Sequence, residues 1–175
     1  MELLLGCGSS RTRRLMVEGR EDWSRLVTVD LNPAHRPEVV ADLDRAPWPF
    51  EDDTFRELHA YEVLEHLGQQ GDARSFFAHF GEIYRILKPG GYLAATVPTW
   101  HGPWAWGDPS HRRVITRGSL AFLDQAEYVR QVGKTAMSDF RWLWKGDFEL
   151  MWTDEDRDSF RFILRAVKPA RIGTA

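Results

Sequence analysis

The sequence predicts an α/β fold, with a doubly wound and mostly parallel sheet that ends in an antiparallel hairpin. Short apolar runs alternate with helical or turn-rich stretches along the first hundred residues, an order typical of parallel sheets. The first run, residues 3–5, is apolar at every position, as in a central strand buried on both faces. The last two runs are joined by a short acidic turn, which permits antiparallel pairing.

Taken in order, apolar and β-branched runs predict strands at residues 3–5, 25–29, 39–41 and 57–60. After Asp72, apolar residues recur at helical spacing as far as Leu87 and predict an amphipathic helix. A Lys-Pro-Gly-Gly segment then ends that helix, because proline and glycine do not continue it. A fifth strand follows, at residues 92–97.

The remaining segments are less regular. Only Met1 and Glu2 precede the first strand, and the helix after that strand is expected to be short because residues 17–20 read as a break. Residues 99–117 predict a loop, and helical material follows around 120–131. Residues 140–152 and 160–167 predict the hairpin, with its turn at 153–156. The whole chain, 1–175, is predicted to form one domain.

Composition narrows the function classes. The net charge of −3 gives no basic field, so nucleic acid is an unlikely partner. Cys7 is the only cysteine, which excludes an internal disulfide and a multi-thiolate metal site. No apolar run is long enough to span a membrane, and the first five residues do not form a secretory signal. We therefore expect a cytoplasmic protein without a membrane partner.

Ligands of such sheets bind at the carboxyl ends of the strands. A Gly6-Cys7-Gly8 turn follows the first strand, and glycine lets the backbone approach a ligand closely. Asp30 ends the second strand, where its carboxylate can accept two hydrogen bonds from a ribose; the alternative is an Asx turn with Asn32. Arg11 stands where a dinucleotide fingerprint has its third glycine, which disfavours NAD and FAD.

Two further strand ends carry polar groups. Asp42 follows the third strand and can accept from an adenine amino group while Leu43 packs on the ring; a turn or cap role is the alternative. Tyr61 and Glu62 follow the fourth strand. The coincidence of these residues at successive strand ends is stronger evidence than any one of them.

The chain resembles class I S-adenosylmethionine-dependent methyltransferases of the small-molecule type, from residue 3 to about residue 123. The segments that carry the resemblance are 3–8, 29–30, 41–43, 47–55, 62–67, 87–93 and 97–98. The resemblance implies a Rossmann-like fold with S-adenosylmethionine as cofactor. Its implied contacts are Gly6, Cys7 and Gly8 at the methionine portion, Asp30 and Leu31 at the ribose, Asp42 and Leu43 at the adenine, and Tyr61 and Glu62 near the sulfonium. His66 is implied near the cofactor, with a helix-packing role as the alternative.

Methyl transfer needs no nucleophilic residue, and it needs a base only when the acceptor must lose a proton of high pKa. The 99–117 loop follows the fifth strand, where this fold places the acceptor, and it carries Trp100, Trp104 and Trp106. These rings can stack on an acceptor or cover an apolar edge of the sheet. From the same loop we hypothesise a catalytic group of His101, Asp108 and His111, with Asp108 orienting His111 as base. The same three residues could form a two-histidine, one-carboxylate metal site, but their spacing matches no known ligand pattern, so no metal is predicted.

The sequence thus favours a methyltransferase whose acceptor is a small molecule or an exposed group of a macromolecule. One alternative is a catalytically inactive S-adenosylmethionine-binding module with an interaction role, which the short N-terminus motivates. An NAD or nucleotide-sugar enzyme of similar topology is a third reading. An open acceptor pocket would also allow a partner subunit to complete it, so a homo-oligomer is included among the expectations.

Overall fold

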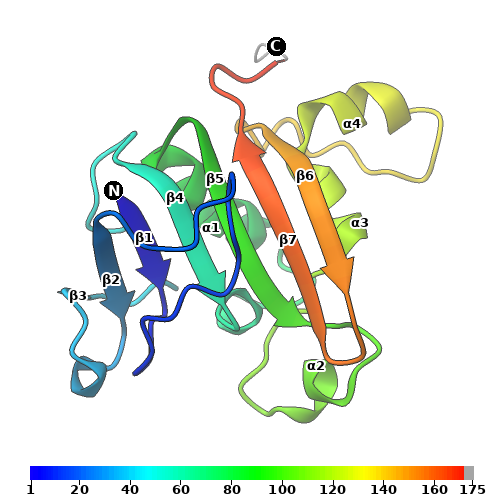
Figure 1. Cartoon of the computed structure of the whole chain (residues 1–175). Helices are drawn as coiled ribbons and strands as arrows, with labels where there is room; N and C mark the ends of the chain where they lie inside the picture. Colours follow the sequence, from blue (N-terminus) through cyan, green and yellow to red (C-terminus); the bar gives the residue numbers. More distant parts are fainter. Residues whose placement is uncertain (172–175) are drawn as a thin grey trace.

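The computed structural model describes residues 1–171 and contains a seven-stranded sheet of order β3-β2-β1-β4-β5-β7-β6 (Figure 1). The parallel strands are β1 (Glu2–Leu5), β2 (Leu26–Asp30), β3 (Val39–Val40), β4 (Phe55–Tyr61) and β5 (Leu87–Pro98). β7 (Ser159–Ala166) runs antiparallel to both β5 and β6 (Phe148–Glu155). The predicted fold class is confirmed.

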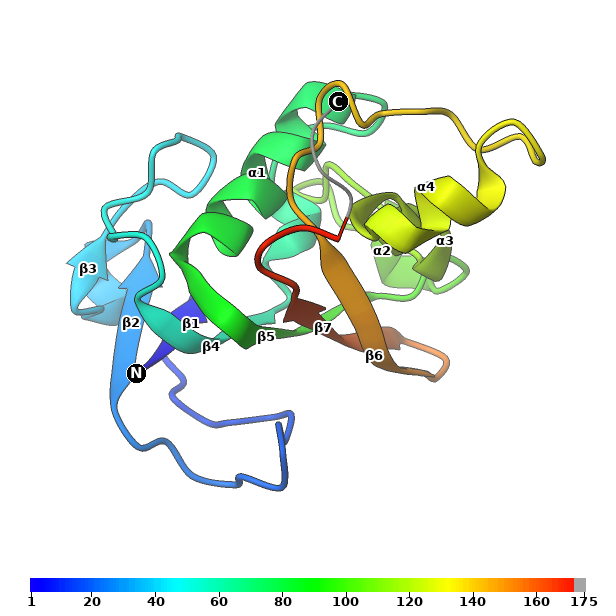
Figure 2. The ribbon, with the colours of Figure 1, turned by 90° about the horizontal axis from the view of Figure 1, so that it is seen from above.

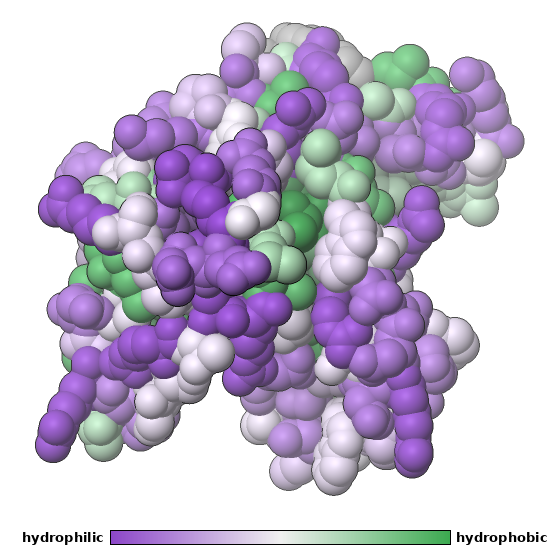
Figure 3. Space-filling model, in the orientation of Figure 1, coloured by the Kyte–Doolittle hydropathy of each residue, from purple (hydrophilic) through white to green (hydrophobic). Residues whose placement is uncertain are grey.

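The two faces of the sheet are covered differently. Figure 2 shows helices α1 (Ala73–Ile86), α2 (Pro103–Gly107), α3 (Arg117–Leu120) and α4 (Gln125–Gln131) on one side, and the blue segment 6–25 on the other. The connection from β1 to β2 and the connection from β4 to β5 therefore cross opposite faces, as double winding requires. The face without helices is mostly hydrophilic, with hydrophobic surface showing in its middle (Figure 3). Among residues 1–171, no helix has the length and apolar composition that a membrane crossing requires.

No helix follows the glycine turn, so the expected short helix is a wrong prediction. Residues 9–24 form turns and a bridge between Val17 and Arg20. The Tyr61 hydroxyl on β4 accepts hydrogen bonds from the backbone N–H groups of Arg14 (3.1 Å) and Leu15 (3.3 Å). The side chains of Leu15 and Val17 are both buried and pack in one hydrophobic cluster with strand residues such as Leu4. Contacts with the sheet thus replace the hydrogen bonds that a helix would have made.

Polar side chains on β4 attach the same segment to the sheet. The buried Glu57 carboxylate forms ion pairs with Arg13 and, at 2.9 Å, with Arg20. His59 bridges Glu57 (3.1 Å) and the Tyr61 hydroxyl (2.7 Å). Burial by itself would raise the pKa of Glu57, but the His59 hydrogen bond and the Arg13 charge outweigh it and lower that pKa to about 2. The side chains on this face of β4 therefore form a hydrogen-bonded polar row rather than an apolar surface.

The helix predicted after Asp72 is confirmed as α1. The Asp72 carboxylate accepts a hydrogen bond from the backbone N–H of Ser75 at 3.1 Å, as an N-cap does. The helix ends at Ile86, and β5 begins at once with Leu87, which pairs with Phe55. The strand therefore starts five residues before the predicted position 92, because the Lys-Pro-Gly-Gly segment is already part of it.

The C-terminal hairpin is confirmed, but its boundaries differ from the prediction. Residues 140–147 are not a strand: Leu143 and Trp144 donate to the Phe140 carbonyl, and Trp144 stacks on Phe77 of α1 at 5.7 Å. Burial of the Trp144 ring against the helix outweighs the β-propensity of this aromatic run. Residues 153–155, which were predicted to lie in the turn, belong to β6, so the turn comprises residues 156–158.

The segments before the hairpin also differ in detail from the prediction. The predicted 99–117 loop contains the short helix α2. The helical material expected around 120–131 is divided among α3, a 3₁₀ turn (Ala121–Leu123) and α4. Asp124 separates the last two, and its carboxylate accepts from the N–H of Ala126 at 2.8 Å.

Candidate active site

The carboxyl ends of β1 and β4 meet where the strand order changes direction. Gly6 follows β1 with φ of +54°, and a Cβ on it would lie 2.5 Å from a methyl group of Val63, which follows β4. Both the backbone angle and the close approach require glycine here. This crevice is where open α/β sheets bind their ligands.

A hydrogen bond joins the glycine turn to the end of β2. The backbone N–H of Gly8 donates to Oδ2 of Asp30 at 2.8 Å, while Oδ1 accepts from the N–H of Asn32 at 2.8 Å and lies 3.1 Å from His35 Nδ1. Burial would raise the pKa of Asp30, but these N–H groups and the imidazole lower it. The Asx turn expected as an alternative is therefore present together with the contact to the glycine turn, and Asp30 stays ionised.

Asp30 belongs to a cavity of about 330 Å³, which we call the acidic pocket. Seven of the residues predicted to bind a cofactor line it, and they come from four strand ends. The full lining comprises Gly6, Asp30, Leu31, Ala41, Asp42, Leu43, Asp44, Glu62, Val63, His66, Leu67 and Arg112. Sequence reasoning missed Asp44 and Arg112, which form an ion pair across 68 residues of chain.

The other predicted residues line a second cavity of about 240 Å³, which we call the glycine-turn pocket. It shares Gly6 with the acidic pocket and is lined by Leu4, Gly6, Cys7, Gly8, Ser9, Ser10, Thr12, Arg14 and Tyr61. The Cys7 side chain is buried among apolar groups, and burial raises the pKa of its thiol. Arg14 supplies the pocket's cation, with its guanidinium carbon 5.3 Å from the centre of the Tyr61 ring. No motif in the sequence singles out Arg14, because scattered arginines are more often part of a solvated face.

Glu62 adopts a backbone conformation that is rare for residues other than glycine. Its φ is +57°, its N–H donates to the Thr96 carbonyl at 2.9 Å, and its carboxylate accepts from the Thr96 hydroxyl at 2.6 Å. Such a conformation costs roughly 1 kcal/mol and persists where neighbouring contacts impose it. Here β5 holds the Glu62 side chain at the edge of the acidic pocket.

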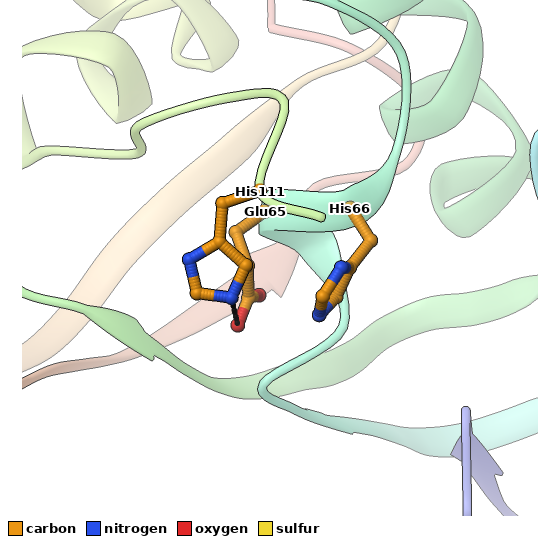
Figure 4. A group of neighbouring side chains, drawn as sticks. All are labelled: Glu65, His66 and His111. Carbon is orange, nitrogen blue, oxygen red and sulfur yellow. Dashed lines mark ion pairs between the residues drawn. The ribbon is translucent and has the colours of Figure 1, made fainter. Parts of the chain in front are cut away.

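A cluster of ionisable groups lies beside Glu62. Glu65 and His66 belong to a 3₁₀ turn (Leu64–His66), and His111 belongs to the loop after α2. The Glu65 carbonyl accepts hydrogen bonds from the backbone N–H groups of both Arg112 (2.9 Å) and Arg113 (3.0 Å), which hold that loop against the turn. Figure 4 shows the three side chains pointing toward one another.

The buried Glu65 carboxylate was not singled out by the sequence analysis. Among residues 1–171, the nearest basic side-chain nitrogen is Nε2 of His111, 3.9 Å from Oε1. Burial raises the pKa of Glu65, and the charge of the neighbouring Glu62 raises it further. Glu65 directly precedes His66 in the sequence, but only the fold shows that the Glu65 side chain is enclosed.

The structure brings together two of the three predicted catalytic residues. Asp108 Oδ2 lies 3.8 Å from His111 Nε2, beyond hydrogen-bond length, while His111 Nδ1 is 2.8 Å from the Trp104 carbonyl. The Trp104 carbonyl rather than Asp108 therefore orients the His111 ring. His101 instead contacts Thr99 (3.2 Å), and no ion pair or hydrogen bond within residues 1–171 joins it to the other two.

The three tryptophans of this region do not cover the core. The exposed fractions are 56% for Trp100, 61% for Trp104 and 70% for Trp106. Of the two roles that the sequence allows, this exposure favours contact with a ligand over covering an apolar edge of the sheet. They remain free to stack on a ligand.

The two pockets carry groups that are chemically complementary to S-adenosylmethionine. The acidic pocket offers a carboxylate for sugar hydroxyls, and Oδ2 of Asp30 keeps a free lone pair beside the Gly8 N–H. On the other side of Gly6, the glycine-turn pocket offers backbone groups and the Arg14 guanidinium for an amino-acid carboxylate.

Comparison with known proteins agrees with this arrangement. A family model described as a methyltransferase domain matches residues 3–95. The sterol 24-C-methyltransferase of Eremothecium gossypii is 33% identical over 108 residues, which are 62% of this chain and 26% of that protein. The chain thus spans about a quarter of the length of that curated relative.

Solved structures share the fold. An S-adenosylmethionine-dependent methyltransferase from Mesorhizobium loti aligns with a TM-score of 0.56 and 14% identity, covering 94% of this chain and 89% of that one. A putative methyltransferase of Haloferax volcanii, solved with the Trm112 methyltransferase activator, aligns with a TM-score of 0.55 and 15% identity, covering 95% and 82%. Since the family model covers more than half of the chain, this protein belongs to the class I S-adenosylmethionine-dependent methyltransferases, and its cofactor is S-adenosylmethionine.

Proposed function

We propose that the protein transfers the methyl group of S-adenosylmethionine to a small-molecule acceptor at the carboxyl edge of its sheet. The observation that carries the proposal is the convergence of four strand ends on one pocket around the Asp30 carboxylate. The cofactor supplies the activated methyl group, and the protein binds, orients and excludes water.

The adenosine half is assigned to the acidic pocket. Asp30 and Leu31 would contact the ribose, with Oδ2 of Asp30 accepting from a hydroxyl. Asp42 and Leu43 would contact the adenine, the carboxylate accepting from the amino group and the Leu43 side chain packing on the ring. An ionised Asp30 suits this role because a charged acceptor forms the stronger hydrogen bond.

The methionine half is assigned to the glycine-turn pocket. Gly6, Cys7 and Gly8 would offer backbone groups, and Arg14 would pair with the carboxylate. A cofactor that spans both pockets would cross Gly6, and its sulfonium would then lie beside Glu62, which Thr96 holds in position. A carboxylate near the sulfonium would stabilise its positive charge by electrostatic attraction.

The acceptor is assigned to the edge formed by the 3₁₀ turn and the loop around α2. His111 has an unprotonated Nε2 when its Nδ1–H donates to Trp104, so it can take a proton from an acceptor. Asp108 at 3.8 Å would stabilise the resulting imidazolium, and the exposed tryptophans would contact a flat or cationic acceptor.

The test has two steps. Calorimetry should first detect binding of S-adenosylhomocysteine and no competition by NAD. The protein is then incubated with methyl-labelled S-adenosylmethionine and a fractionated cell extract, with Asp30→Ala as the control. Label in the small-molecule fraction supports the proposal, and label only in protein or nucleic acid contradicts the acceptor class. Tight cofactor binding without any transfer would favour the inactive binding module.

A further inference from the structure

Three potential ligand atoms lie together at the edge of the acidic pocket. One carboxylate oxygen of Glu65 and one ring nitrogen each of His66 and His111 all lie within 4.8 Å of one another (Figure 4). The residues come from the turn after β4 and from a loop more than 40 residues later. His66 also lines the acidic pocket, so the cluster borders the space assigned to the cofactor.

Backbone hydrogen bonds set the tautomers of both histidines. Nδ1 of His66 lies 3.2 Å from the Ser110 carbonyl, and Nδ1 of His111 lies 2.8 Å from the Trp104 carbonyl. A carbonyl oxygen only accepts, so both Nδ1 atoms carry hydrogen. Each Nε2 therefore presents a lone pair, and a backbone carbonyl behind the ring is the usual outer partner of a metal-binding histidine.

The Glu65 carboxylate lacks a partner that would explain its burial. Its side chain is 2% exposed, and neither of its oxygens has a hydrogen-bond partner among the described residues. No lysine or arginine of residues 1–171 forms an ion pair with it, and the nearest basic side-chain nitrogen is Nε2 of His111, at 3.9 Å. A buried carboxylate without a hydrogen-bond partner needs a proton or a cation beside it.

We propose that Glu65, His66 and His111 bind one divalent transition-metal cation, of the Zn²⁺ or Mn²⁺ type. Two imidazoles and a carboxylate suit these ions better than Ca²⁺ or Mg²⁺, which prefer all-oxygen sites. Ligand atoms about 2.1 Å from a tetrahedral cation are about 3.4 Å apart, so the cluster must contract by roughly an ångström. The sequence analysis predicted no metal, because it considered His101, Asp108 and His111 as the set.

With a metal bound, Nε2 of His111 is a ligand and no longer the base assigned above, so the cation would activate the acceptor instead. This consequence rests on the proposed function. Three protein ligands leave a coordination position open, and an acceptor hydroxyl bound there is more acidic. That hydroxyl loses its proton to solvent, and its oxygen forms a bond to the methyl carbon. The carbon–sulfur bond breaks with its electron pair on sulfur, which leaves S-adenosylhomocysteine. The acceptor class favoured is therefore an alcohol or phenol.

The experiment measures the metal alone. The full chain is freed of metal with a chelator and titrated by calorimetry with Zn²⁺ and with Mn²⁺, and Co²⁺ serves as a spectroscopic probe of nitrogen ligation. One equivalent of at least one cation should bind. Glu65→Gln, His66→Ala and His111→Asn should each weaken binding at least tenfold. His66→Ala keeps the test decisive if Glu65→Gln does not fold, because the His66 ring is only half-buried.

His101→Ala is the matched control, since it removes a histidine of the same loop outside the cluster and should leave cation affinity unchanged. Binding of S-adenosylhomocysteine by the Glu65→Gln and His111→Asn variants, whose residues do not line the acidic pocket, shows that this pocket is folded. For His66→Ala, an unchanged thermal unfolding curve shows the same. Wild-type protein that binds S-adenosylhomocysteine but no cation overturns the metal site and leaves the proposed function standing. Cation binding that survives all three substitutions also overturns it. Cation binding without any S-adenosylhomocysteine binding supports the metal site and contradicts the proposed function.

Discussion

Gly8 and Asp30 are 22 residues apart and are joined by a hydrogen bond of 2.8 Å from the backbone N–H to the carboxylate. The bond connects the turn after β1 to the end of β2, and it lies between the two pockets assigned to the cofactor. One carboxylate therefore orders the turn, and in the proposed function it would also accept a hydrogen bond from the ligand.

Asp30→Ala should weaken S-adenosylhomocysteine binding by about 10- to 100-fold, since hydrogen bonds to a charged group contribute about 1.5–3 kcal/mol. Asp30→Asn should lose less, because its amide oxygen can still accept from Gly8 while the charge is gone. Calorimetry on both variants measures the difference. Equal affinity for wild type and Asp30→Ala would remove the adenosine assignment.

Gly6→Ala should destabilise the fold more than Gly8→Ala. Both residues have φ above +50°, but a Cβ on Gly6 meets Val63 at 2.5 Å whereas a Cβ on Gly8 meets nothing within 4 Å. The backbone angle alone costs about 1 kcal/mol at either site. Urea unfolding should show that loss for Gly8→Ala and at least about 2 kcal/mol for Gly6→Ala. A reversed order would contradict the geometry of the crevice.

Glu57 should contribute stability that is lost in acid. Its pKa in the folded state is about 2, below the ordinary value of 4.5, so the contribution is complete above pH 4.5 and falls as the pH drops toward 2. Glu57→Gln should be less stable than wild type at pH 7 by a few kcal/mol. Urea unfolding at a series of pH values should show this difference narrowing below pH 4.5. A difference that stays constant with pH would exclude the ion pairs with Arg13 and Arg20 as its cause.

Arg14→Met should distinguish the contributions that the two halves of the cofactor make to binding. The guanidinium lines the glycine-turn pocket, so its removal should weaken S-adenosylhomocysteine binding by up to about tenfold. Adenosine, which has no carboxylate, should bind both proteins equally. Arg157→Met, at an exposed arginine in the turn between β6 and β7, is the control and should change neither affinity. An equal loss for both ligands would contradict the assignment of Arg14 to the carboxylate.

Trp104 and Trp142 offer a matched pair, because each is 61% exposed. Replacing either ring by alanine should change the free energy of unfolding by less than about 0.5 kcal/mol. Once an acceptor is identified, only Trp104→Ala should raise its KM, since Trp142 instead lies beside Arg74 of α1. A KM unchanged by Trp104→Ala would place the acceptor elsewhere.

Local sequence patterns were sufficient to predict much of the fold. The all-apolar run at 3–5, the helical spacing after Asp72 and the short connection before residue 160 each reflect contacts between near neighbours in the chain. The strand-end residues could also be predicted, because parallel strands bring their carboxyl ends to one edge whatever the loops do. Seven of those residues line one pocket as a result.

The amino-acid sequence by itself determined the order of strands and helices and the kind of residue at each strand end, since these depend on periodicity, caps and turns. Only the tertiary structure decided the conformation of residues 9–24, because the hydrogen bonds that hold Arg14 and Leu15 against the sheet come from Tyr61 on β4. It also decided which histidine lies beside Glu65. The backbone N–H groups of Arg112 and Arg113 bind the Glu65 carbonyl and bring His111 across, and no local pattern encodes a contact between segments so far apart.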